Sequence, residues 1–443
     1  MSYKYSNYNI ESPKFNDKVL VCNLLKESII TINKKEVYKL FENRIIPDDI
    51  NLLNKFIKSG IIIDENINEI DGIINENEDS IKNRDVLSFT IFPSSNCQLG
   101  CVYCGQLHNK NKLHNNTHNA IIQTLEKLIQ GKKQLNVGWF GGEPLLGIDV
   151  IIKLTPKLKE LSQKYNCTYT SSITTNALLL NKKNAKVLIE NGVNDIAVSI
   201  DGIEKYHDLR RPTKGGEGSY NIILKNLQDF FAFIKDNDIQ LSRFMIRINV
   251  DKYNKEGVEP LFHELKNIGC QEVVTGWDIA PIHSWGNDAV KRALDFDEFS
   301  DFKLDMIIKL LELGLIKYPP FPVRVRTLCQ AVTYDSLYVD ARGQMYDCSE
   351  MPLVSDSNKY ELGTIFDPIE ELNKKRHYTN WNRELKNYPC LNCNILPVCG
   401  GGCPKSWKEG FIPCPAFKNN IGEYLLLSYI YEKNNKNFIG EKN

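Results

Sequence analysis

Three cysteines near residue 100 have the spacing of a metal centre. Cys97, Cys101 and Cys104 follow the pattern C-x3-C-x2-C in the stretch SSNCQLGCVYCGQ. A structural zinc site takes four protein ligands, and a disulfide framework takes an even number of cysteines. Three thiolates therefore indicate a metal centre with one open position. From the residues alone, the alternative is a zinc site that borrows a fourth ligand such as His108.

A second group of cysteines lies toward the C-terminus. The chain has 13 cysteines, and the later ones follow C-x18-C and then C-x2-C-x5-C-x3-C-x10-C between Cys329 and Cys414. Clustered cysteines in a cytoplasmic protein hold metal more often than they form disulfides, because the compartment is reducing. Cys22, Cys167 and Cys270 stand alone, and we expect them to be small buried side chains.

The first motif resembles the cluster motif of the radical S-adenosylmethionine (SAM) superfamily. In that family three cysteines hold three irons of a [4Fe–4S] cluster, and the fourth iron binds the amino and carboxylate groups of SAM. Soft thiolates suit such a cluster. The resemblance therefore implies that SAM fills the open position left by Cys97, Cys101 and Cys104.

Residues beyond the cysteines extend the resemblance to the SAM contacts. Tyr103 corresponds to the aromatic residue that the family places against the adenine, and the GGEP motif corresponds to the segment that binds the SAM amino group. A serine and an arginine hold the ribose and the carboxylate in related maturases. The implied SAM-binding residues are Tyr103, Gly141, Gly142, Glu143, Pro144, Ser199, Asp201 and Arg211.

The later cysteines resemble the SPASM domain, which carries two auxiliary [4Fe–4S] clusters. Matched by motif, one cluster is assigned to Cys390, Cys393, Cys399 and Cys414, and the other to Cys329, Cys348 and Cys403. The second set lacks the fourth cysteine of the fuller family pattern. Its fourth position is either open to substrate or filled by Cys270, Asp335 or another group.

The resemblance implies a radical SAM peptide maturase. An electron from a flavodoxin- or ferredoxin-type donor would cleave SAM to methionine and a 5′-deoxyadenosyl radical. That radical would abstract hydrogen from a ribosomally made precursor peptide with a leader. The peptide radical would close a thioether or carbon–carbon cross-link, and the auxiliary clusters would carry an electron away.

Two departures in the sequence separate this reading from sulfatase maturation. Sulfatase maturases place an aspartate base directly after the cysteine that matches Cys348, whereas this chain has Ser349 and then Glu350. The second auxiliary set also has one cysteine too few. We expect Glu350 or Asp347 to take the proton. The alternatives are an anaerobic sulfatase-type protein maturase and, in another class, a zinc-binding module without enzymatic activity.

Hydrophobic patterning places these motifs in an α/β chain of three parts. Residues 86–320 alternate β-branched strands with amphipathic helices, which predicts a partial (β/α)6 barrel with its site at the carboxyl ends of the strands. Residues 1–85 predict a winged-helix-like, peptide-binding domain with a hairpin at residues 18–33 and a polar linker at 68–85. Residues 321–443 form the cysteine-rich SPASM part, with little periodicity before a helix at residues 422–433. The six strand candidates are residues 87–94, 136–142, 168–176, 195–201, 244–251 and 272–280.

The composition excludes several classes of partner. Lys+Arg and Asp+Glu both total 55 in the 443 residues, so the balanced charge predicts no nucleic-acid or anionic-membrane partner. The N-terminus has no apolar signal-peptide core, and no stretch approaches the ~20 apolar residues of a membrane span. We therefore expect a cytoplasmic protein.

Overall fold

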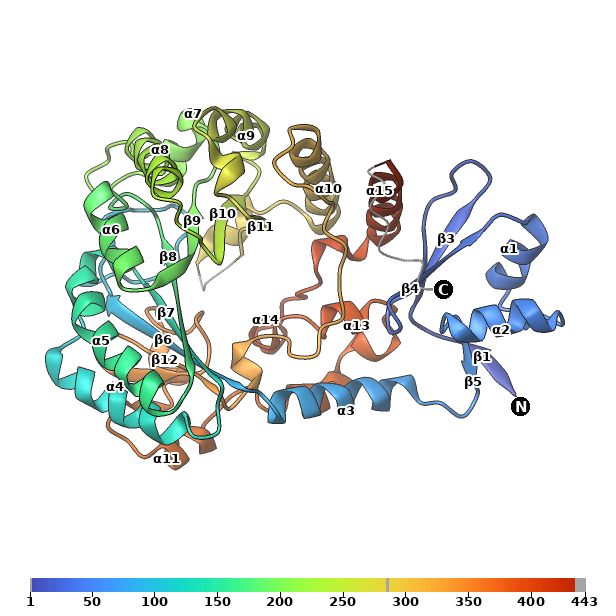
Figure 1. Ribbon diagram of the computed structural model, residues 1–443, viewed down its shortest axis with the longest axis horizontal. Coiled ribbons are helices and arrows are strands. Elements are labelled where there is room, and N and C mark those ends of the chain that lie inside the picture. Colours follow the sequence, from blue (N-terminus) through green and yellow to red (C-terminus); the bar gives the residue numbers. More distant parts are fainter. Residues whose placement is uncertain (1, 284–286, 435–443) are drawn as a thin grey trace.

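A mixed sheet with a parallel core dominates the molecule. The computed structural model describes residues 2–283 and 287–434 (Figure 1). Strands in this sheet follow the order β11-β10-β9-β8-β7-β6-β12-β13-β14. Strands β6 to β11 pair in parallel and confirm all six predicted strands. Their bounds are β6 (Val86–Ser94), β7 (Gln134–Gly141), β8 (Thr168–Thr175), β9 (Val193–Ser199), β10 (Arg243–Val250) and β11 (Gly276–Pro281).

Helices cover the outer face of this parallel sheet (Figure 1). They are α4 (Asn115–Leu128), α5 (Ile148–Lys164), α6 (Lys182–Glu190), α7 (Glu204–Arg210), α8 (Tyr220–Asp236) and α9 (Val258–Asn267). Side chains alternate along each strand, so β7 buries Leu135, Val137 and Trp139 while Asn136 and Gly138 stay partly accessible. The apolar set packs against the helices. The opposite face is left free to carry a site, as expected for a partial (β/α)6 fold.

The sheet continues beyond the predicted six strands. Strands β12 (Ser336–Val339), β13 (Gln344–Tyr346) and β14 (Gly363–Thr364) come from the cysteine-rich part, where the sequence shows little periodicity. Strand β12 pairs in parallel with β6, and Leu337 lies opposite Phe89. These strands are two to four residues long, too short for an alternating pattern to be visible in the sequence. Their pairing brings Cys348, just after β13, close to the first strand of the barrel.

The N-terminal part contains the predicted hairpin. Strands β3 (Val19–Asn23) and β4 (Ser28–Ile32) pair antiparallel, and β2 (Asn9–Glu11) adds a third strand on the other side of β3. Strand β4 is therefore an edge strand of this sheet. Helices α1 (Lys35–Glu42) and α2 (Ile50–Lys58) follow, and β1 (Tyr3–Tyr5) pairs with β5 (Ile62–Asp64).

The polar linker predicted at residues 68–85 is wrong for most of its length. Helix α3 (Glu69–Lys82) occupies it. The preceding residue, Asn68, caps this helix, because its side chain accepts a hydrogen bond from the Asp71 N–H. Ile73 is buried in the same core as aromatic residues of the C-terminal part. Arg324 donates to the Glu76 carboxylate at 3.0 Å. The helix thus ties the N-terminal part to the cysteine-rich part, a tertiary role that its polar composition conceals.

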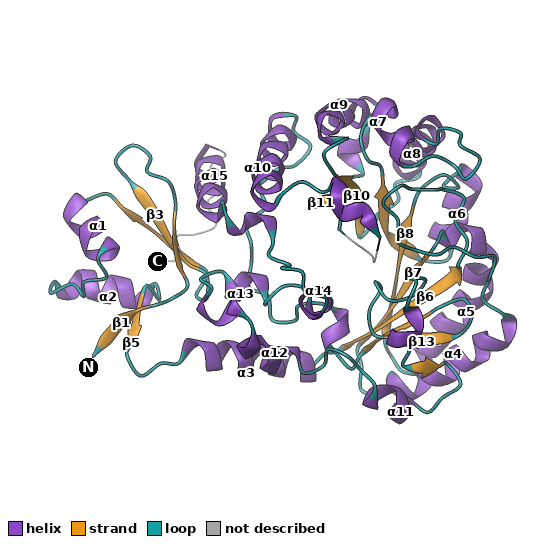
Figure 2. Cartoon of the chain, turned by 180° about the vertical axis from the view of Figure 1, so that it is seen from behind, coloured by secondary structure: helices purple, strands orange, loops and turns teal. Residues whose placement is uncertain are grey.

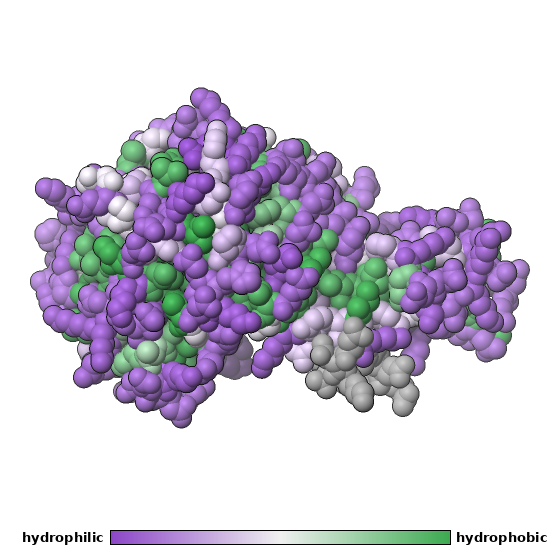
Figure 3. Space-filling model, turned by 90° about the horizontal axis from the view of Figure 1, so that it is seen from above, coloured by the Kyte–Doolittle hydropathy of each residue, from purple (hydrophilic) through white to green (hydrophobic). Residues whose placement is uncertain are grey.

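The cysteine-rich part lies between the parallel sheet and the N-terminal part (Figure 2). Helix α10 (Phe296–Glu312) precedes this part, whose own helices are α11 (Ile369–Lys374), α12 (Trp381–Glu384), α13 (Leu396–Cys399), α14 (Pro404–Lys408) and α15 (Ile421–Asn434). Helix α15 confirms the predicted C-terminal helix and contacts β2 and β3. Hydrophilic side chains dominate the face in Figure 3, and apolar ones gather near the junction with the N-terminal part. Among the described residues, no helix is long and apolar enough to cross a membrane.

Candidate active site and cysteine centres

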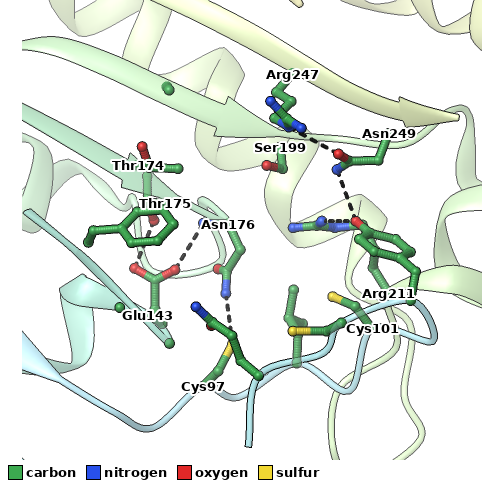
Figure 4. A pocket seen from close by; sticks show the side chains of 18 of the residues that line it. Cys97, Cys101, Glu143, Thr174, Thr175, Asn176, Ser199, Arg211, Arg247 and Asn249 are labelled. Atoms are coloured by element: carbon green, nitrogen blue, oxygen red, sulfur yellow. Dashed lines mark hydrogen bonds between the residues drawn. The ribbon is translucent and has the colours of Figure 1, made fainter. Parts of the chain in front are cut away.

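A cavity of about 370 Å³ opens at the carboxyl ends of the parallel strands. This volume is in the usual range for small-molecule sites. All three cysteines of the first motif lie in its wall, together with most of the predicted SAM contacts (Figure 4). The predicted site residues in the wall are Cys97, Cys101, Tyr103, Cys104, Gly141, Gly142, Glu143, Ser199, Arg211 and Glu350.

The cysteine loop is held in place by its backbone. After β6 ends at Ser94, the Gly100 N–H donates to the Pro212 carbonyl at 2.8 Å and the Val102 N–H donates to the Arg210 carbonyl at 2.9 Å. These bonds attach the loop to the segment that carries Arg211. They fix the middle of the motif, and all three of its cysteines lie in the wall of one cavity.

Burial keeps the three thiols protonated when no metal is bound. It raises the pKa of Cys97 to about 11 and that of Cys101 to about 12, and it also raises the pKa of Cys104. The nearby Arg211 guanidinium acts in the opposite direction on all three. The Asn176 side-chain amide donates to the Cys97 sulfur at 3.5 Å (Figure 4). Because metal binds thiolates, loading this site must release protons.

The GGEP turn at the end of β7 lies directly against the cysteine loop. The Gly142 N–H donates to the Ser94 carbonyl at 3.2 Å, and the Glu143 N–H donates to the Asn96 carbonyl at 2.8 Å. A Cβ atom at Gly142 would lie 2.5 Å from the Asn96 carbonyl oxygen, which is backbone and cannot swing away. The glycine is therefore required for this close approach.

Glu143 is fully buried and its carboxylate is already well engaged. One oxygen accepts hydrogen bonds from the Leu145 N–H at 2.9 Å and the Thr175 hydroxyl at 2.8 Å. The other accepts from the Asn176 N–H at 2.9 Å (Figure 4). Burial raises the pKa of this carboxyl, and the hydrogen bonds and Arg211 act against that rise. The second oxygen has room for one more donor, as the predicted contact with an amino group requires.

A buried polar network supports the opposite wall. The Tyr103 hydroxyl donates to the Asp201 carboxylate at 2.5 Å and accepts from Arg211 at 2.5 Å and from the Asn249 amide at 3.1 Å. The Arg211 Nε has no hydrogen-bond partner among the described residues although it is buried. A donor left in this state at a cavity wall fits an anionic group of a bound ligand.

Three predicted site residues lie outside the cavity wall. Pro144 is buried at the start of the short 3₁₀ turn Pro144–Gly147. Asp201 lies behind Tyr103 and also accepts the Asn249 N–H at 2.9 Å. Asp347 is buried and accepts the His377 N–H at 2.7 Å. These positions suit structural support rather than direct contact with a ligand in the cavity.

The sequence analysis missed several polar residues of the wall. Thr174 and Asn176 end β8 or follow it, and Arg247 and Asn249 lie on β10. Both strands are predicted correctly, and polar residues near the carboxyl end of a barrel strand are the available signal. His283 also lines the cavity, and its Nε2 lies 3.1 Å from the Glu350 carboxylate.

A second cavity, of about 180 Å³, is surrounded by cysteines of the C-terminal part. Cys390, Cys393, Cys399 and Cys414 all lie in its wall, as the motif comparison predicts for one auxiliary cluster. Burial raises the pKa of Cys390 and of Cys399 to about 11. The remaining wall is apolar apart from Lys418, whose ammonium donates to the Cys414 sulfur at 3.4 Å. Such a dry, four-thiol cavity suits a fully ligated cluster.

Three consecutive glycines separate this cavity from Cys403. Gly400, Gly401 and Gly402 have φ of 67°, 92° and 73°, a left-handed run that residues with a Cβ adopt only under strain. The Gly401 carbonyl accepts a hydrogen bond from the Trp407 indole at 2.8 Å. Cys403 is not in the cavity wall. The turn therefore sends Cys399 and Cys403 to different cysteine groups.

Cys403 interacts instead with Cys329 and Cys348. Burial raises the pKa of Cys348 well above its usual value, and the charges of Glu350, Cys329 and Cys403 raise it further. Of the two candidate fourth ligands, Cys270 is fully buried in the barrel core, and Asp335 pairs with Lys132 at 2.8 Å. Glu350 also lies next to this group, since its backbone N–H donates to the Cys348 sulfur at 3.5 Å.

The donor sets fit clusters better than single ions. Among the described residues, no group of three or more Cys, His, Asp or Glu side chains is placed to hold one metal ion. A cluster spreads its thiolates farther apart, because each sulfur binds a different iron. The first cavity combines three thiols with the Glu143 carboxylate and the unpaired Arg211 Nε. These residues fit a cluster together with a zwitterionic cofactor.

Comparison with known proteins identifies the central domain. A model of the radical SAM superfamily matches residues 91–265. The chain carries a radical SAM domain. SAM and a [4Fe–4S] cluster are the cofactors of that superfamily, so the predicted cofactor pair is confirmed. A zinc-binding module without enzymatic activity is set aside, because the matched superfamily consists of enzymes.

Curated relatives of this radical SAM enzyme include sulfatase maturases. The chain is 24% identical over 370 residues to the cysteine-type anaerobic sulfatase-maturating enzyme of Clostridium novyi, covering 75% of this chain and 94% of that protein. It is 24% identical over 352 residues to the serine-type enzyme of Bacteroides thetaiotaomicron, covering 70% of this chain and 80% of that protein. The chain is therefore a radical SAM enzyme related to this group.

Solved structures agree with the fold. The maturase anSMEcpe, bound to AdoMet and a peptide, matches with a TM-score of 0.57 at 20% identity over 80% of this chain and 99% of that chain. Streptococcus suis SuiB, bound to its precursor peptide SuiA, matches with a TM-score of 0.52 at 15% identity over 94% and 99%. The match with SuiB thus covers more of this chain than the match with anSMEcpe does.

The Gly142 contact gives a test of the site. Replacing Gly142 by alanine should push the GGEP turn away from Asn96, because the added Cβ meets backbone atoms. We expect loss of stability by about 1–3 kcal/mol, typical of overpacking, and weaker SAM binding. Denaturant unfolding and equilibrium dialysis with SAM measure the two effects.

Gly72 provides the matched control for this substitution. It lies inside α3 and a Cβ there meets nothing within 4 Å. Gly72→Ala should therefore stabilise the chain by about 0.5–1 kcal/mol and leave SAM binding unchanged. Equal SAM affinity in the Gly142→Ala and wild-type proteins would contradict the assignment of this turn to the cofactor site.

Proposed function

We propose that this radical SAM enzyme modifies a ribosomally made precursor peptide. The N-terminal part binds the leader of that peptide, and the enzyme closes a thioether or carbon–carbon cross-link. The observation that carries the proposal is the open edge of β4 in the N-terminal sheet. An edge strand can accept an extended peptide as an added strand. Ile29 on β4 is 48% exposed, which leaves an apolar side chain available to a peptide. SuiB, a similar fold, is bound to its precursor peptide.

The chain's own residues have the following roles in this proposal. Cys97, Cys101 and Cys104 would hold the SAM-binding cluster, Glu143 would accept the SAM amino group, and Arg211 would face its carboxylate. Once bound, the cofactor pair supplies a carbon-centred radical that removes a hydrogen atom from the substrate. The cavity excludes bulk water, and its wall fixes the orientation of the reacting groups.

The auxiliary cysteine groups belong to the same proposal. Cys390, Cys393, Cys399 and Cys414 would hold one [4Fe–4S] cluster in the second cavity. Cys329, Cys348 and Cys403 would hold another with three protein thiolates, which leaves one position for a further ligand. The low-potential electron donor is proposed to be of the flavodoxin or ferredoxin type.

The second candidate function is maturation of a sulfatase. It is favoured by the match to the Clostridium novyi enzyme, which covers 94% of that protein. Against it stands Ser349 in the cavity wall, at the position where the sequence comparison places the aspartate base of those enzymes. The two candidates differ in the substrate and in the product, so one experiment separates them.

The experiment compares two peptides under identical anaerobic conditions. The reconstituted enzyme receives SAM, dithionite and either a candidate precursor peptide, sought among small open reading frames beside the gene, or a cysteine-type sulfatase peptide. We expect the precursor to lose two hydrogen atoms in mass, and to react poorly once its leader is removed. Formation of formylglycine in the sulfatase peptide, with an unchanged precursor, would overturn the peptide cross-linking proposal.

Glu350 is the proposed acceptor of the substrate proton. Its carboxylate lines the SAM cavity and is partly exposed, with His283 beside it. Glutamine keeps the shape but cannot accept a proton, so Glu350→Gln should lower product formation by about 10²–10⁴ while iron content and SAM binding stay unchanged. Liquid chromatography of the modified peptide measures the loss.

Asp347, the other acidic residue predicted as a base, provides the control substitution for Glu350. It is buried and held by the His377 N–H, so Asp347→Asn should lower the free energy of unfolding without a selective loss of product per folded enzyme. A Glu350→Gln enzyme with full activity would remove Glu350 from the role of base.

A further inference from the structure

A hollow of about 610 Å³ lies beside the SAM cavity and shares part of its wall. Cys97 and His108 line both spaces. The hollow is more open to solvent, and its other residues come from the cysteine loop and from the segment after Arg211. They are Asn96, Gln98, Asn109, Lys110, Thr213, Lys214, Gly215 and Glu217. Cys97, one of the three cysteines assigned to the SAM-binding cluster, therefore borders both the SAM cavity and this more open hollow.

The hollow carries two lysines without a carboxylate partner. Lys110 and Lys214 are exposed, and neither forms an ion pair with a described residue. The Lys214 ammonium reaches the Asn96 side-chain oxygen at 3.4 Å, which aims it at the cysteine loop. Glu217 is the one carboxylate in the wall. The hollow therefore has an excess of positive charge.

A neighbouring hollow extends this positive surface. It has a volume of about 460 Å³ and shares Lys110 with the first. Lys112 and Lys153 lie in its wall and both contact Asp149. The whole chain has no net charge, so this excess of lysines is local.

We propose that Lys110 and Lys214, with Lys112 and Lys153 at the rim, form the docking surface for an acidic one-electron carrier protein. The inference rests on the proposed function, which requires an electron donor, and adds where the donor binds. The carrier in its reduced form loses one electron, and the cluster held by Cys97, Cys101 and Cys104 gains that electron; no bond is made or broken in this step. Opposite charges would speed the encounter and align the partners.

The position of the surface supports an electron donor over a peptide substrate. A peptide must enter the SAM cavity to meet the radical, and Ser199, Arg247 and Glu350 line that cavity. None of these three residues lines the lysine hollow, which reaches Cys97 through its own wall. The donor would therefore use a surface that differs from the substrate-binding wall.

The test compares a protein donor with a small one. Charge reversal in Lys110→Glu/Lys214→Glu is examined by stopped-flow reduction of the reconstituted enzyme with flavodoxin hydroquinone and, separately, with dithionite. The flavodoxin rate at low salt should fall at least about tenfold and lose its salt dependence. The dithionite rate should stay unchanged, because a small reductant needs no docking surface. The electron paramagnetic resonance signal of the reduced cluster reports the extent of reduction.

Two further variants keep the test decisive. Lys127→Glu/Lys317→Glu makes the same charge change at exposed lysines outside both hollows, and it should leave the flavodoxin rate unchanged. The single variant Lys110→Glu tests the surface without changing Lys214, in case the charge reversal at Lys214 disturbs the cysteine loop.

An unchanged flavodoxin rate in the Lys110 and Lys214 variants would overturn the proposal that these lysines form the docking surface. An equal loss with dithionite would do the same, since it would mean a damaged cluster. Reduction of the cluster by dithionite with SAM cleavage, but without any response to flavodoxin, would reject the surface while leaving the proposed function intact.

Discussion

Replacing Cys97, Cys101 and Cys104 together by alanine lowers the iron content from roughly 12 to roughly 8 atoms per chain and abolishes SAM cleavage. The reason is that these three thiols line the SAM cavity, whereas the seven other predicted ligands lie in separate groups. The auxiliary clusters should therefore remain. Iron and acid-labile sulfide are measured after anaerobic reconstitution, together with 5′-deoxyadenosine formation.

Cys167 gives the control for this experiment. Its sulfur donates to the Lys132 carbonyl at 3.0 Å, away from all three cysteine groups. Cys167→Ser should retain roughly 12 irons and full SAM cleavage. A wild-type content of roughly four irons, lost in the triple variant, would leave the radical SAM chemistry standing and remove both auxiliary clusters. Iron unchanged by the triple substitution would refute the assignment of this motif.

Replacing Asp201 by asparagine lowers the free energy of unfolding by about 3–5 kcal/mol and weakens SAM binding. Asp201 is fully buried, and Arg210 and Arg211 lie 3.8 and 3.7 Å from its carboxylate. Removing its charge leaves two buried guanidinium groups with less compensation. It also removes the acceptor that orients the Tyr103 hydroxyl in the cavity wall.

Asp195 on β9, the strand that ends two residues before Asp201, provides the comparison for Asp201. Its carboxylate pairs with Arg243 at 2.8 Å on the surface, so Asp195→Asn should cost less than about 1 kcal/mol. Urea unfolding of both variants, followed by circular dichroism, measures the difference. Equal losses of unfolding free energy in the two variants would show that the buried Asp201 network stabilises the protein no more than the surface pair of Asp195 and Arg243 does.

The Asp201 contribution also has a defined dependence on pH. The two arginines and the Tyr103 hydrogen bond hold the pKa of this carboxyl below its usual value, against the effect of burial. A group whose pKa is lowered on folding stabilises the folded state fully above its unfolded pKa of about 3.9. We therefore expect the gap between wild type and Asp201→Asn to be constant above about pH 5 and to shrink as the pH falls below about 4.

The regular part of the fold was predictable because its signals are local. Six strands were predicted from runs of six to nine residues that combine β-branched, aromatic and other apolar side chains. Helix α8 (Tyr220–Asp236) is one of the predicted amphipathic helices, since its apolar positions recur at helical spacing. In α3 most positions are polar, although its four isoleucines, at positions 70, 73, 74 and 81, recur at helical spacing. The contacts of that helix with Arg324 and Arg326, about 250 positions later in the chain, are tertiary and no local pattern reveals them.

The cysteine motifs were also readable in advance. Ligands for one cluster lie close together in sequence, so their spacing carries the information. Cys390, Cys393, Cys399 and Cys414 were assigned to one group by motif comparison, and the structure places all four around one cavity. The assignment of Cys403 to the other group follows physically from the left-handed Gly400–Gly402 turn.

The sequence by itself determined the residue types of the site, namely three thiols, a glycine-rich turn with Glu143, and Arg211 later in the chain. Only the tertiary structure decided which of them face the cavity. Side chains separated by roughly a hundred residues converge because parallel strands bring their carboxyl ends to one edge. That edge placed Asn176, Arg247 and Asn249 in the wall, and it placed Asp201 behind Tyr103. The pairing of β12 with β6 also brought Glu350, whose backbone N–H donates to the Cys348 sulfur, into the wall of the SAM cavity.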